Sequence, residues 1–271
     1  PSQAIAEVAA KYKREKKPNN AKYAAMVESV DDSTRQILAT LKELGIDRDT
    51  LIIFTSDNGG LDHNGSPTEN APLRSGKGYA YEGGIRVPFL VRWPGVIPAG
   101  KVSETPVCSI DLFPTILEAT GTALPTDRAI DGLSFLSHLK SGGEAKIARD
   151  ELLWHFPHYR GRVIPYSIIR RGDWKLIKYD VMDGKVRETQ LFNLAENPNE
   201  FIAEHGKPAP QTDLAEDPAH AGKLAEMEAL LLAEMRRLHD PYRLWNQPQA
   251  EIDLPPRQLK PKRLKKNKGA K

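Results

Sequence analysis

The first third of the chain contains segments with helical spacing of apolar residues, followed by shorter runs typical of strands. Between Tyr23 and Leu44 apolar residues recur at steps of three and four, which predicts an amphipathic helix with Gly45 at its C-cap. An earlier helix-prone segment, residues 2–17, ends at Pro18 and two asparagines. The apolar positions of the longer helix are Tyr23, Met26, Val27, Val30, Ile37, Leu38, Leu41 and Leu44.

Short apolar runs beyond residue 50 predict strands of a layered sheet. Residues 51–56 (LIIFTS) form a continuous run of the kind found in strands that are covered on both faces. A helix, a short loop and a buried strand in this order form one unit of a layered α/β sheet. Residues 59–84, rich in Gly, Ser, Pro and Asn, predict a long irregular loop. Residues 87–93 predict another strand, and residues 109–120 predict a short helix with Pro114 in its first turn.

After about residue 140 the pattern changes to closely spaced short strands. The segments ELLWHF, YSIIRRG, DWKLIKYD and QLFNL predict four strands, and the periodicity of residues 221–238 predicts a helix. A small antiparallel sheet with a helix packed on it fits this order. We therefore predict an α/β domain over residues 1–143, a small α+β subdomain over residues 144–245, and a basic, disordered tail over residues 246–271.

The charge of the chain is unevenly distributed. The net charge is +3, but residues 255–271 hold eight Lys or Arg and no acidic residue, and the rest of the chain has 31 basic and 36 acidic residues. A basic tail of this kind is usually solvated. Its charges are not interleaved with aromatic residues, so we expect no nucleic-acid binding, with the tail as a weak exception.

Membrane spans, signal peptides and cysteines are the sequence features that indicate cellular location. No apolar run reaches the 18 residues of a membrane span, and the chain begins without Met or a signal-peptide pattern, as the middle of a longer chain would. The single cysteine, Cys108, excludes an internal disulfide and a zinc site built on cysteines. These features leave the cellular location undetermined.

The carboxyl end of the first predicted strand carries TSDNGG, residues 55–60. Ligands of layered α/β sheets bind beyond the carboxyl ends of strands, where Asp57 and Asn58 fall. Their oxygens suit Ca²⁺ or Mg²⁺ rather than zinc, although the same residue types also favour turns for local reasons. The pattern alone therefore leaves a metal site and a capped turn open. Two ligands fall short of the about six to eight that Ca²⁺ takes, so others must come from elsewhere.

The next cluster is LRSGKGYAYEGGIRVPFLVRWPG, residues 73–95. Lys77 lies between two glycines, which lets its ammonium approach an anion without crowding, although an exposed loop lysine would have the same sequence. Glu82 and Arg86 are four residues apart, so we expect them to pair across a helical turn in a structural role.

Five sequence blocks follow one another along most of the chain: SDNGG, GKGYAYEGGIRVPFLVRWPG, DLFPTILEATG, DGLSF and RRGDWKLI. In order and spacing they resemble the type I sulfatases of the arylsulfatase-like branch. The resemblance implies an α/β fold like that of alkaline phosphatase, with a mixed sheet between helices and a small C-terminal subdomain of four antiparallel strands and a helix. It also implies that this chain is the C-terminal half of such an enzyme.

The resemblance also implies a catalytic mechanism. The family hydrolyses sulfate esters with a formylglycine, made from the Cys or Ser of a C-x-P-S-R motif, and with a calcium ion. By similarity, Asp57 and Asn58 are two protein ligands of that ion, and Lys77 is the catalytic lysine that contacts the substrate sulfate. The expected substrate is a sulfated small molecule or glycan, and the expected location is periplasmic or secreted.

Other parts of the family's site are missing from this sequence. There is no C-x-P-S-R motif, and Cys108, in CSIDLF, is expected to be a small buried hydrophobe. The Asp31–Asp32 pair lies within a predicted helix, so it does not replace the early calcium ligands of the family. His63, in the loop after the metal pair, is a candidate for substrate contact; His155 and His158 fit either a cleft or a packed position.

Several hypotheses therefore stay open. The chain is a fragment of a longer protein, one chain of a processed enzyme, or a truncated, non-catalytic relative. The main hypothesis is a sulfuric ester hydrolase whose site is only partly carried here. The alternatives are a phosphatase or phosphodiesterase of the same superfold, and a binding module that holds polyanions through its basic tail. The Asp-Asn pair with one nearby histidine favours one calcium over two transition metals.

Overall fold

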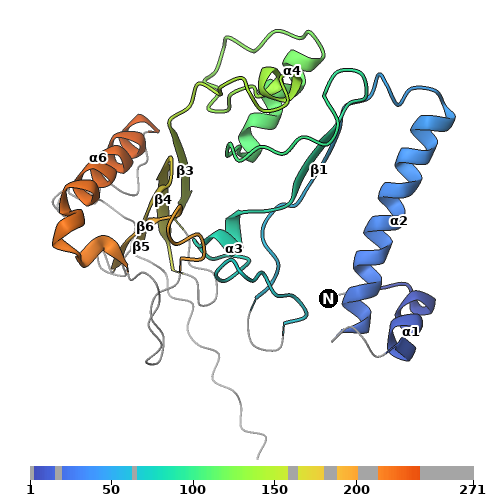
Figure 1. Ribbon diagram of the computed structural model, residues 1–271, viewed down its shortest axis with the longest axis horizontal. Helices are drawn as coiled ribbons and strands as arrows, with labels where there is room; N and C mark the ends of the chain where they lie inside the picture. Colours follow the sequence, from blue (N-terminus) through green and yellow to red (C-terminus); the bar gives the residue numbers. More distant parts are fainter. Residues whose placement is uncertain are drawn as a thin grey trace, which may run out of the picture.

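The computed structural model describes residues 3–15, 20–62, 66–157, 164–179, 188–200 and 213–238. It shows an α/β protein in which two N-terminal helices, a two-stranded sheet, a group of short helices and a four-stranded sheet with its own helix follow in chain order (Figure 1). The predicted fold class is confirmed, although both described sheets are antiparallel. The predicted domain boundaries stay a prediction, and the basic tail lies outside the described residues.

The N-terminal helices are α1 (Ala6–Glu15) and α2 (Ala21–Glu43), which pack against each other and lie at the far end of the molecule from the small sheet (Figure 1). The Asn20 side chain caps α2 by accepting a hydrogen bond from the Tyr23 N–H. Gly45 follows α2 with a φ of +70°, as its predicted place at the C-cap requires. The predicted apolar positions include four that stay largely exposed: Val27, Val30, Ile37 and Leu44.

The two-stranded sheet pairs β1 (Ile52–Thr55) with β2 (Phe89–Arg92), so that Ile53 lies opposite Val91. Both strands match the predicted segments, but the predicted burial of the first strand on both faces is wrong. Phe54 is 40% exposed and Leu90 is 59% exposed. The described part of the chain supplies only these two strands to the sheet, so its faces stay partly uncovered.

Three short helices follow β1 along the chain: α3 (Glu82–Ile85) before β2, and α4 (Leu112–Ala119) and α5 (Leu136–Lys140) after it. A 3₁₀ turn, η1 (Ser109–Asp111), leads into α4, with Pro114 buried in the first turn as predicted. The buried Asp111 carboxylate accepts hydrogen bonds from the N–H groups of Cys108 and Leu133 and pairs with the Arg149 guanidinium. Asp111 therefore ties the start of α4 to two later segments.

The small sheet has the order β3-β4-β5-β6, with every neighbouring pair antiparallel. Its elements are β3 (Glu151–Phe156), β4 (Tyr166–Arg171), β5 (Trp174–Tyr179), β6 (Glu188–Asn193), the turns η2 (Leu214–Glu216) and η3 (Pro218–His220), and α6 (Ala221–Arg237). These strands and this helix are those the sequence predicts.

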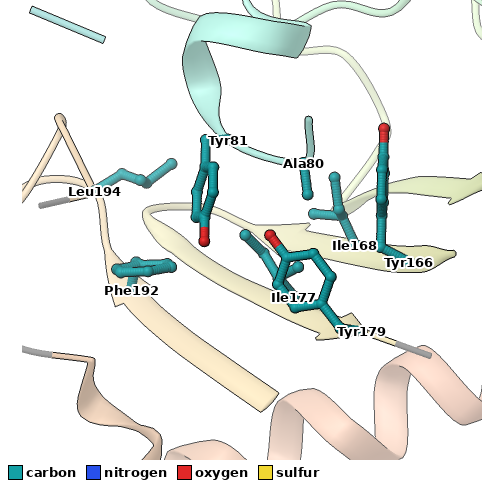
Figure 2. Packing of buried hydrophobic residues seen from close by; sticks show 8 residues of the cluster. All are labelled: Ala80, Tyr81, Tyr166, Ile168, Ile177, Tyr179, Phe192 and Leu194. Atoms are coloured by element: carbon teal, nitrogen blue, oxygen red, sulfur yellow. The ribbon is translucent and has the colours of Figure 1, made fainter. Parts of the chain in front are cut away.

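Each face of the small sheet is covered by a different partner, because side chains alternate between the faces along a strand. On one face the buried side chains of β4–β6 pack against α6 through Met227, Leu231 and Met235. On the other face they pack against Ala80 and Tyr81, which belong to the irregular loop before α3 (Figure 2). The predicted long loop is therefore an integral layer of the small sheet's core.

Candidate functional site

Asp57 and Asn58 form a turn immediately after β1, at its carboxyl end, as predicted. Asp57 is exposed and Asn58 is half-buried, and the Ser56 hydroxyl donates a hydrogen bond to the Asn58 backbone carbonyl. Within the described part of the chain, neither the Asp57 carboxylate nor the Asn58 amide makes a hydrogen bond or an ion pair. Their oxygens are therefore available to a ligand.

Backbone hydrogen bonds hold this turn against the loop that carries Lys77. The Gly59 N–H donates to the Gly84 carbonyl at 3.0 Å, and the Lys77 N–H donates to the Gly60 carbonyl at 2.9 Å. The Asn70 side chain bonds both the N–H and the carbonyl of Gly60, at 3.2 and 2.9 Å. The structure therefore brings together the two segments that the sequence singled out separately.

Close approach of three backbone segments explains the glycines in this region. A Cβ at Gly59 would overlap the carbonyl oxygen of Gly83, and a Cβ at Gly83 would overlap the carbonyl oxygens of Arg74 and Ser75. Only glycine allows the backbones to lie this close. The turn of Asp57, the Lys77 loop and α3 thus form one packed unit.

Lys77 is half-buried, and its ammonium has no hydrogen-bond or ion-pair partner within the described residues. A lysine held by its backbone with an unpaired ammonium suits an anion as a point charge. The structure places this cation on the loop bonded to the Asp57–Asn58 turn, and no carboxylate of the described residues pairs with it.

The predicted pairing of Glu82 with Arg86 is wrong. Among the described residues, Arg86 donates only its backbone N–H, to the Glu82 carbonyl, at the end of α3. The buried Glu82 carboxylate instead lies 2.9 Å from the Lys175 ammonium and 3.7 Å from the Arg170 guanidinium, both on the small sheet. Tertiary packing explains the different partner of Glu82. Its carboxylate is directed toward the small sheet, and Arg86 lies in an extended segment past the end of α3.

A buried network of charges joins α3 to the small sheet. Lys175 Nζ, with 0% exposure, lies between Glu82 Oε1 at 2.9 Å and Glu200 Oε1 at 2.7 Å. The other Glu200 oxygen accepts the Glu82 N–H. Burial raises the pKa of Glu200, against the opposing effect of the Lys175 charge. We call Glu82, Lys175 and Glu200 the buried ion network.

The sequence offered one signal for this network. Lys175 alternates with Ile177 and Tyr179 along β5, so its position on a buried face follows from strand periodicity. Glu200 lies beyond β6 with a φ of +51°, and no local pattern predicts that it reaches α3.

Of the three candidate histidines, the structure describes His155. His63 and His158 lie outside the described residues, so the prediction for His63 stays a prediction. His155 is half-buried on β3, with its Nδ1 2.7 Å from the Ser167 hydroxyl, as expected for a packed position. Cys108 is half-buried rather than fully buried and takes part in capping η1.

The donor set fits a hard cation in type but only partly in number. Asp57 and Asn58 offer one carboxylate and one amide oxygen, which suit Ca²⁺ or Mg²⁺. Among the described residues no group of three or more His, Cys, Asp or Glu is placed to hold a metal ion. The pair therefore supplies about two of the six to eight oxygens that calcium takes. None of the helices in the described ranges is long and apolar enough to cross a membrane.

Two family models and several known proteins match this chain. The family model described as Sulfatase matches residues 1–122, and the model described as N-sulphoglucosamine sulphohydrolase, C-terminal, matches residues 75–220. A protein named Sulfatase from Formosa agariphila is 39% identical over 179 residues, which cover 60% of this chain and 32% of that protein. The steryl-sulfatase of Rattus norvegicus is 43% identical over 143 residues, covering 49% of this chain and 24% of that one.

Solved structures show the same fold. The crystal structure of Ps i-CgsB in complex with k-i-k-neocarrahexaose matches with a TM-score of 0.68 and 28% identity, over 93% of this chain and 49% of that chain. BT4656 in complex with its substrate D-glucosamine-2-N,6-O-disulfate matches with a TM-score of 0.64 and 23% identity, over 87% and 46%. The chain thus spans about half the length of these solved structures and a third or less of the two named relatives. With both family models matched in sequence order, this chain belongs to the type I sulfatase family.

Proposed function

We propose that the intact protein containing this chain hydrolyses sulfate esters, and that Asp57, Asn58 and Lys77 are part of its active site. The observation that carries this proposal is the pair of backbone hydrogen bonds that hold the Asp57–Asn58 turn against α3 and the Lys77 loop. They hold two oxygen donors and one cation on a single packed unit, with all three side chains unpaired among the described residues.

The proposed role of Asp57 and Asn58 is to hold a calcium ion, with magnesium as the alternative. A carboxylate and an amide oxygen are hard donors, and the Asp57 carboxylate lowers the positive charge of the site by one. Bound calcium supplies positive charge beside the oxygens of a sulfate group. Its remaining ligands are expected from outside this chain.

The proposed role of Lys77 is to contact a sulfate oxygen and to stabilise the negative charge that develops during ester cleavage. A cation that is already in place needs no reorganisation when the reaction occurs, and removal of one such group typically costs about 10²–10³ in rate. The backbone bond from Lys77 to Gly60 supports this role, since it fixes the base of the side chain beside the metal pair.

The nucleophile is expected outside this chain. The 271 residues contain no C-x-P-S-R motif from which a formylglycine is made. We therefore expect the isolated chain to show no turnover and to bind calcium weakly. A periplasmic or secreted location is the corresponding proposal for the intact protein.

The proposed substrate class is a sulfated sugar or a sulfated small molecule. Two fold relatives support the sugar, because one holds k-i-k-neocarrahexaose and another holds a glucosamine disulfate named as its substrate. The steryl-sulfatase among the relatives supports a small molecule.

The test is turnover by the intact protein, produced with its formylglycine confirmed by mass spectrometry. Release of sulfate from 4-nitrophenyl sulfate is expected, with loss after EDTA treatment and recovery on addition of calcium. 4-Nitrophenyl phosphate serves as the matched substrate for the phosphatase alternative. Absence of sulfate release, or faster cleavage of the phosphate ester, would contradict the proposal.

The polyanion-binding alternative rests on residues 255–271, which lie outside the described residues. Heparin binding by the chain with and without these residues tests it. Equal binding by both forms would exclude this alternative.

A further inference from the structure

A cavity of about 290 Å³ lies between the loop that carries Lys77 and one face of the small sheet. This volume is at the lower limit of small-molecule pockets, about 300 Å³, so it suits a single ring rather than a chain of rings. We call it the Tyr166 cavity. Its lining residues are Arg74, Ser75, Tyr79, Ala80, Tyr81, Ile164, Tyr166 and Tyr179.

The walls of the Tyr166 cavity are aromatic and rigid. The Tyr81 and Tyr179 rings meet at 6.5 Å between centroids, the Tyr166 and Tyr179 rings at 6.3 Å, and Tyr166 stacks on Phe156 at 5.3 Å. The Tyr81 hydroxyl donates to the Gln190 side chain at 3.0 Å, which fixes that ring as well. Aromatic faces of this kind favour contact with a flat, partly apolar ligand surface.

Tyr166 supplies an unused polar group to this cavity. The residue is 7% exposed, yet its hydroxyl has no hydrogen-bond partner among the described residues. Burial raises the pKa of Tyr166, so the hydroxyl stays neutral and can both donate and accept. In Figure 2 the ring rises from β4 and its hydroxyl points to the side of the sheet on which Ala80 lies. The residue as a whole is buried, but its hydroxyl is not among the buried atoms that lack a partner in the described part of the chain, so it is accessible from the cavity and can bond a ligand there.

Arg74 supplies positive charge. Its guanidinium lies 3.9 Å from the centre of the Tyr81 ring and donates one hydrogen bond to the Glu200 backbone carbonyl at 2.9 Å. No carboxylate of the described residues pairs with it. A guanidinium has five N–H donors, so several remain for an anionic group.

We infer that the Tyr166 cavity binds one sugar ring that carries an anionic group, with the anion on Arg74 and a ring hydroxyl on Tyr166. The inference rests on the proposed function, because it makes the cavity a second subsite beside the cleavage site. The two sites share one loop: Arg74, Ser75 and residues 79–81 line the cavity, and Lys77 lies between these two groups in the sequence without lining it. A sulfated saccharide longer than one ring would occupy both.

A binding titration tests this without turnover. The probes are glucuronic acid and glucosamine 6-sulfate, with glucose as the neutral control, added to the intact protein and followed by ligand-observed NMR. The anionic sugars should bind more tightly than glucose. Tyr166→Phe should weaken their binding about 5–10-fold, the cost of one hydrogen bond. Tyr23→Phe, on α2, removes the same hydroxyl elsewhere and should change nothing.

Two further measurements distinguish failure of the cavity inference from failure of the proposed function. The unfolding midpoint of Tyr166→Phe should equal that of the wild type, because its hydroxyl has no partner to lose among the described residues. Turnover of 4-nitrophenyl sulfate by the wild-type protein is the second readout. Equal binding of glucose and the anionic sugars, or equal binding by Tyr166→Phe and the wild type, would overturn the inference. Failure of aryl sulfate turnover would instead reject the proposed function and leave the binding result to stand separately.

Discussion

Two groups of charged residues are linked to α3, and they differ in whether their charges have partners among the described residues. Asp57 and Lys77 carry charges without partners among the described residues and are partly or fully exposed. In the buried ion network, Lys175 is inaccessible to solvent and lies between two carboxylates at 2.7 and 2.9 Å. The difference separates charges that hold the fold from charges that are left for a ligand.

The same α3 connects the two groups. Its first residue, Glu82, belongs to the buried ion network, while Gly83 and Gly84 bond Arg74 and Gly59 through the backbone. A buried ion pair adds little net stability, because desolvation offsets the attraction, but it is sensitive to loss of one partner. We therefore interpret the network as a device that positions α3, and through it the Asp57 turn and the Lys77 loop.

The largest expected effect on stability comes from removal of the buried Lys175 ammonium. Lys175→Met leaves Glu82 and Glu200 buried without an ammonium, and should lower the free energy of unfolding by about 3–5 kcal/mol. Urea denaturation of the intact protein, followed by tryptophan fluorescence, measures this. Lys223→Met removes a lysine that pairs with Glu226 on the surface, and should leave the midpoint almost unchanged. Equal effects of the two substitutions would contradict the comparison.

Removal of the unpaired cation, Lys77, should lower activity and leave stability unchanged. Lys77→Ala in the intact protein should lower kcat/KM for 4-nitrophenyl sulfate by about 10²–10³, because one charge opposite the developing sulfate charge is lost. The unfolding midpoint should stay within error of the wild type. A stability loss like that of Lys175→Met, with activity retained, would show that Lys77 belongs to the fold rather than to the site.

A substitution in α3, which links the two groups, should have an intermediate effect on stability and should also affect activity. Gly83→Ala forces a Cβ against the carbonyl oxygens of Arg74 and Ser75, and should cost about 1–3 kcal/mol through backbone displacement. It should also weaken activity, because the same displacement moves the Lys77 loop. Gly222→Ala, in the first turn of α6, meets nothing within 4 Å and should be neutral or stabilising by up to about 1 kcal/mol. A neutral Gly83→Ala would remove the argument for close backbone packing.

The smallest expected effect is a pH dependence. Burial raises the pKa of Glu200 above its ordinary value of 4.5, so the native state binds this proton more tightly than the unfolded state. The resulting stabilisation is present below pH 4.5 and is lost as the pH rises through the pKa of Glu200 in the folded protein. Glu200→Gln does not titrate, so its stability relative to the wild type should improve as the pH rises over that window. Urea midpoints of both proteins at successive pH values measure this, and a constant difference would contradict it.

Much of the fold could be predicted because periodicity is local. The helices α2 and α6 and the four strands of the small sheet follow from spacing alone. The exposure of β1 could not, because LIIF is the same run whether or not other strands cover it. Sequence reasoning gave Glu82 the wrong partner because Arg86 is near in sequence, whereas Lys175 is near in space.

The candidate site residues could be singled out from the sequence, but the arrangement of their segments could not. Asp57, Asn58 and Lys77 stand out through their residue types, their glycine neighbours and the resemblance to sulfatases. Nothing in their spacing predicts the bonds from Gly59 to Gly84 and from Lys77 to Gly60 that hold their segments together, because such contacts depend on how the loop folds back.

The central claim, that the turn after β1 supplies two ligands of a calcium site, is tested most directly by a calcium titration of turnover. The intact protein is stripped with EDTA, and the calcium concentration that restores half of the 4-nitrophenyl sulfate activity is measured. Asp57→Ala should raise that concentration at least about tenfold, as expected for loss of a metal ligand, whereas Asp62→Ala, a carboxylate in the same loop, should not change it. An unchanged calcium requirement in Asp57→Ala, or an equal shift in both variants, would contradict the account.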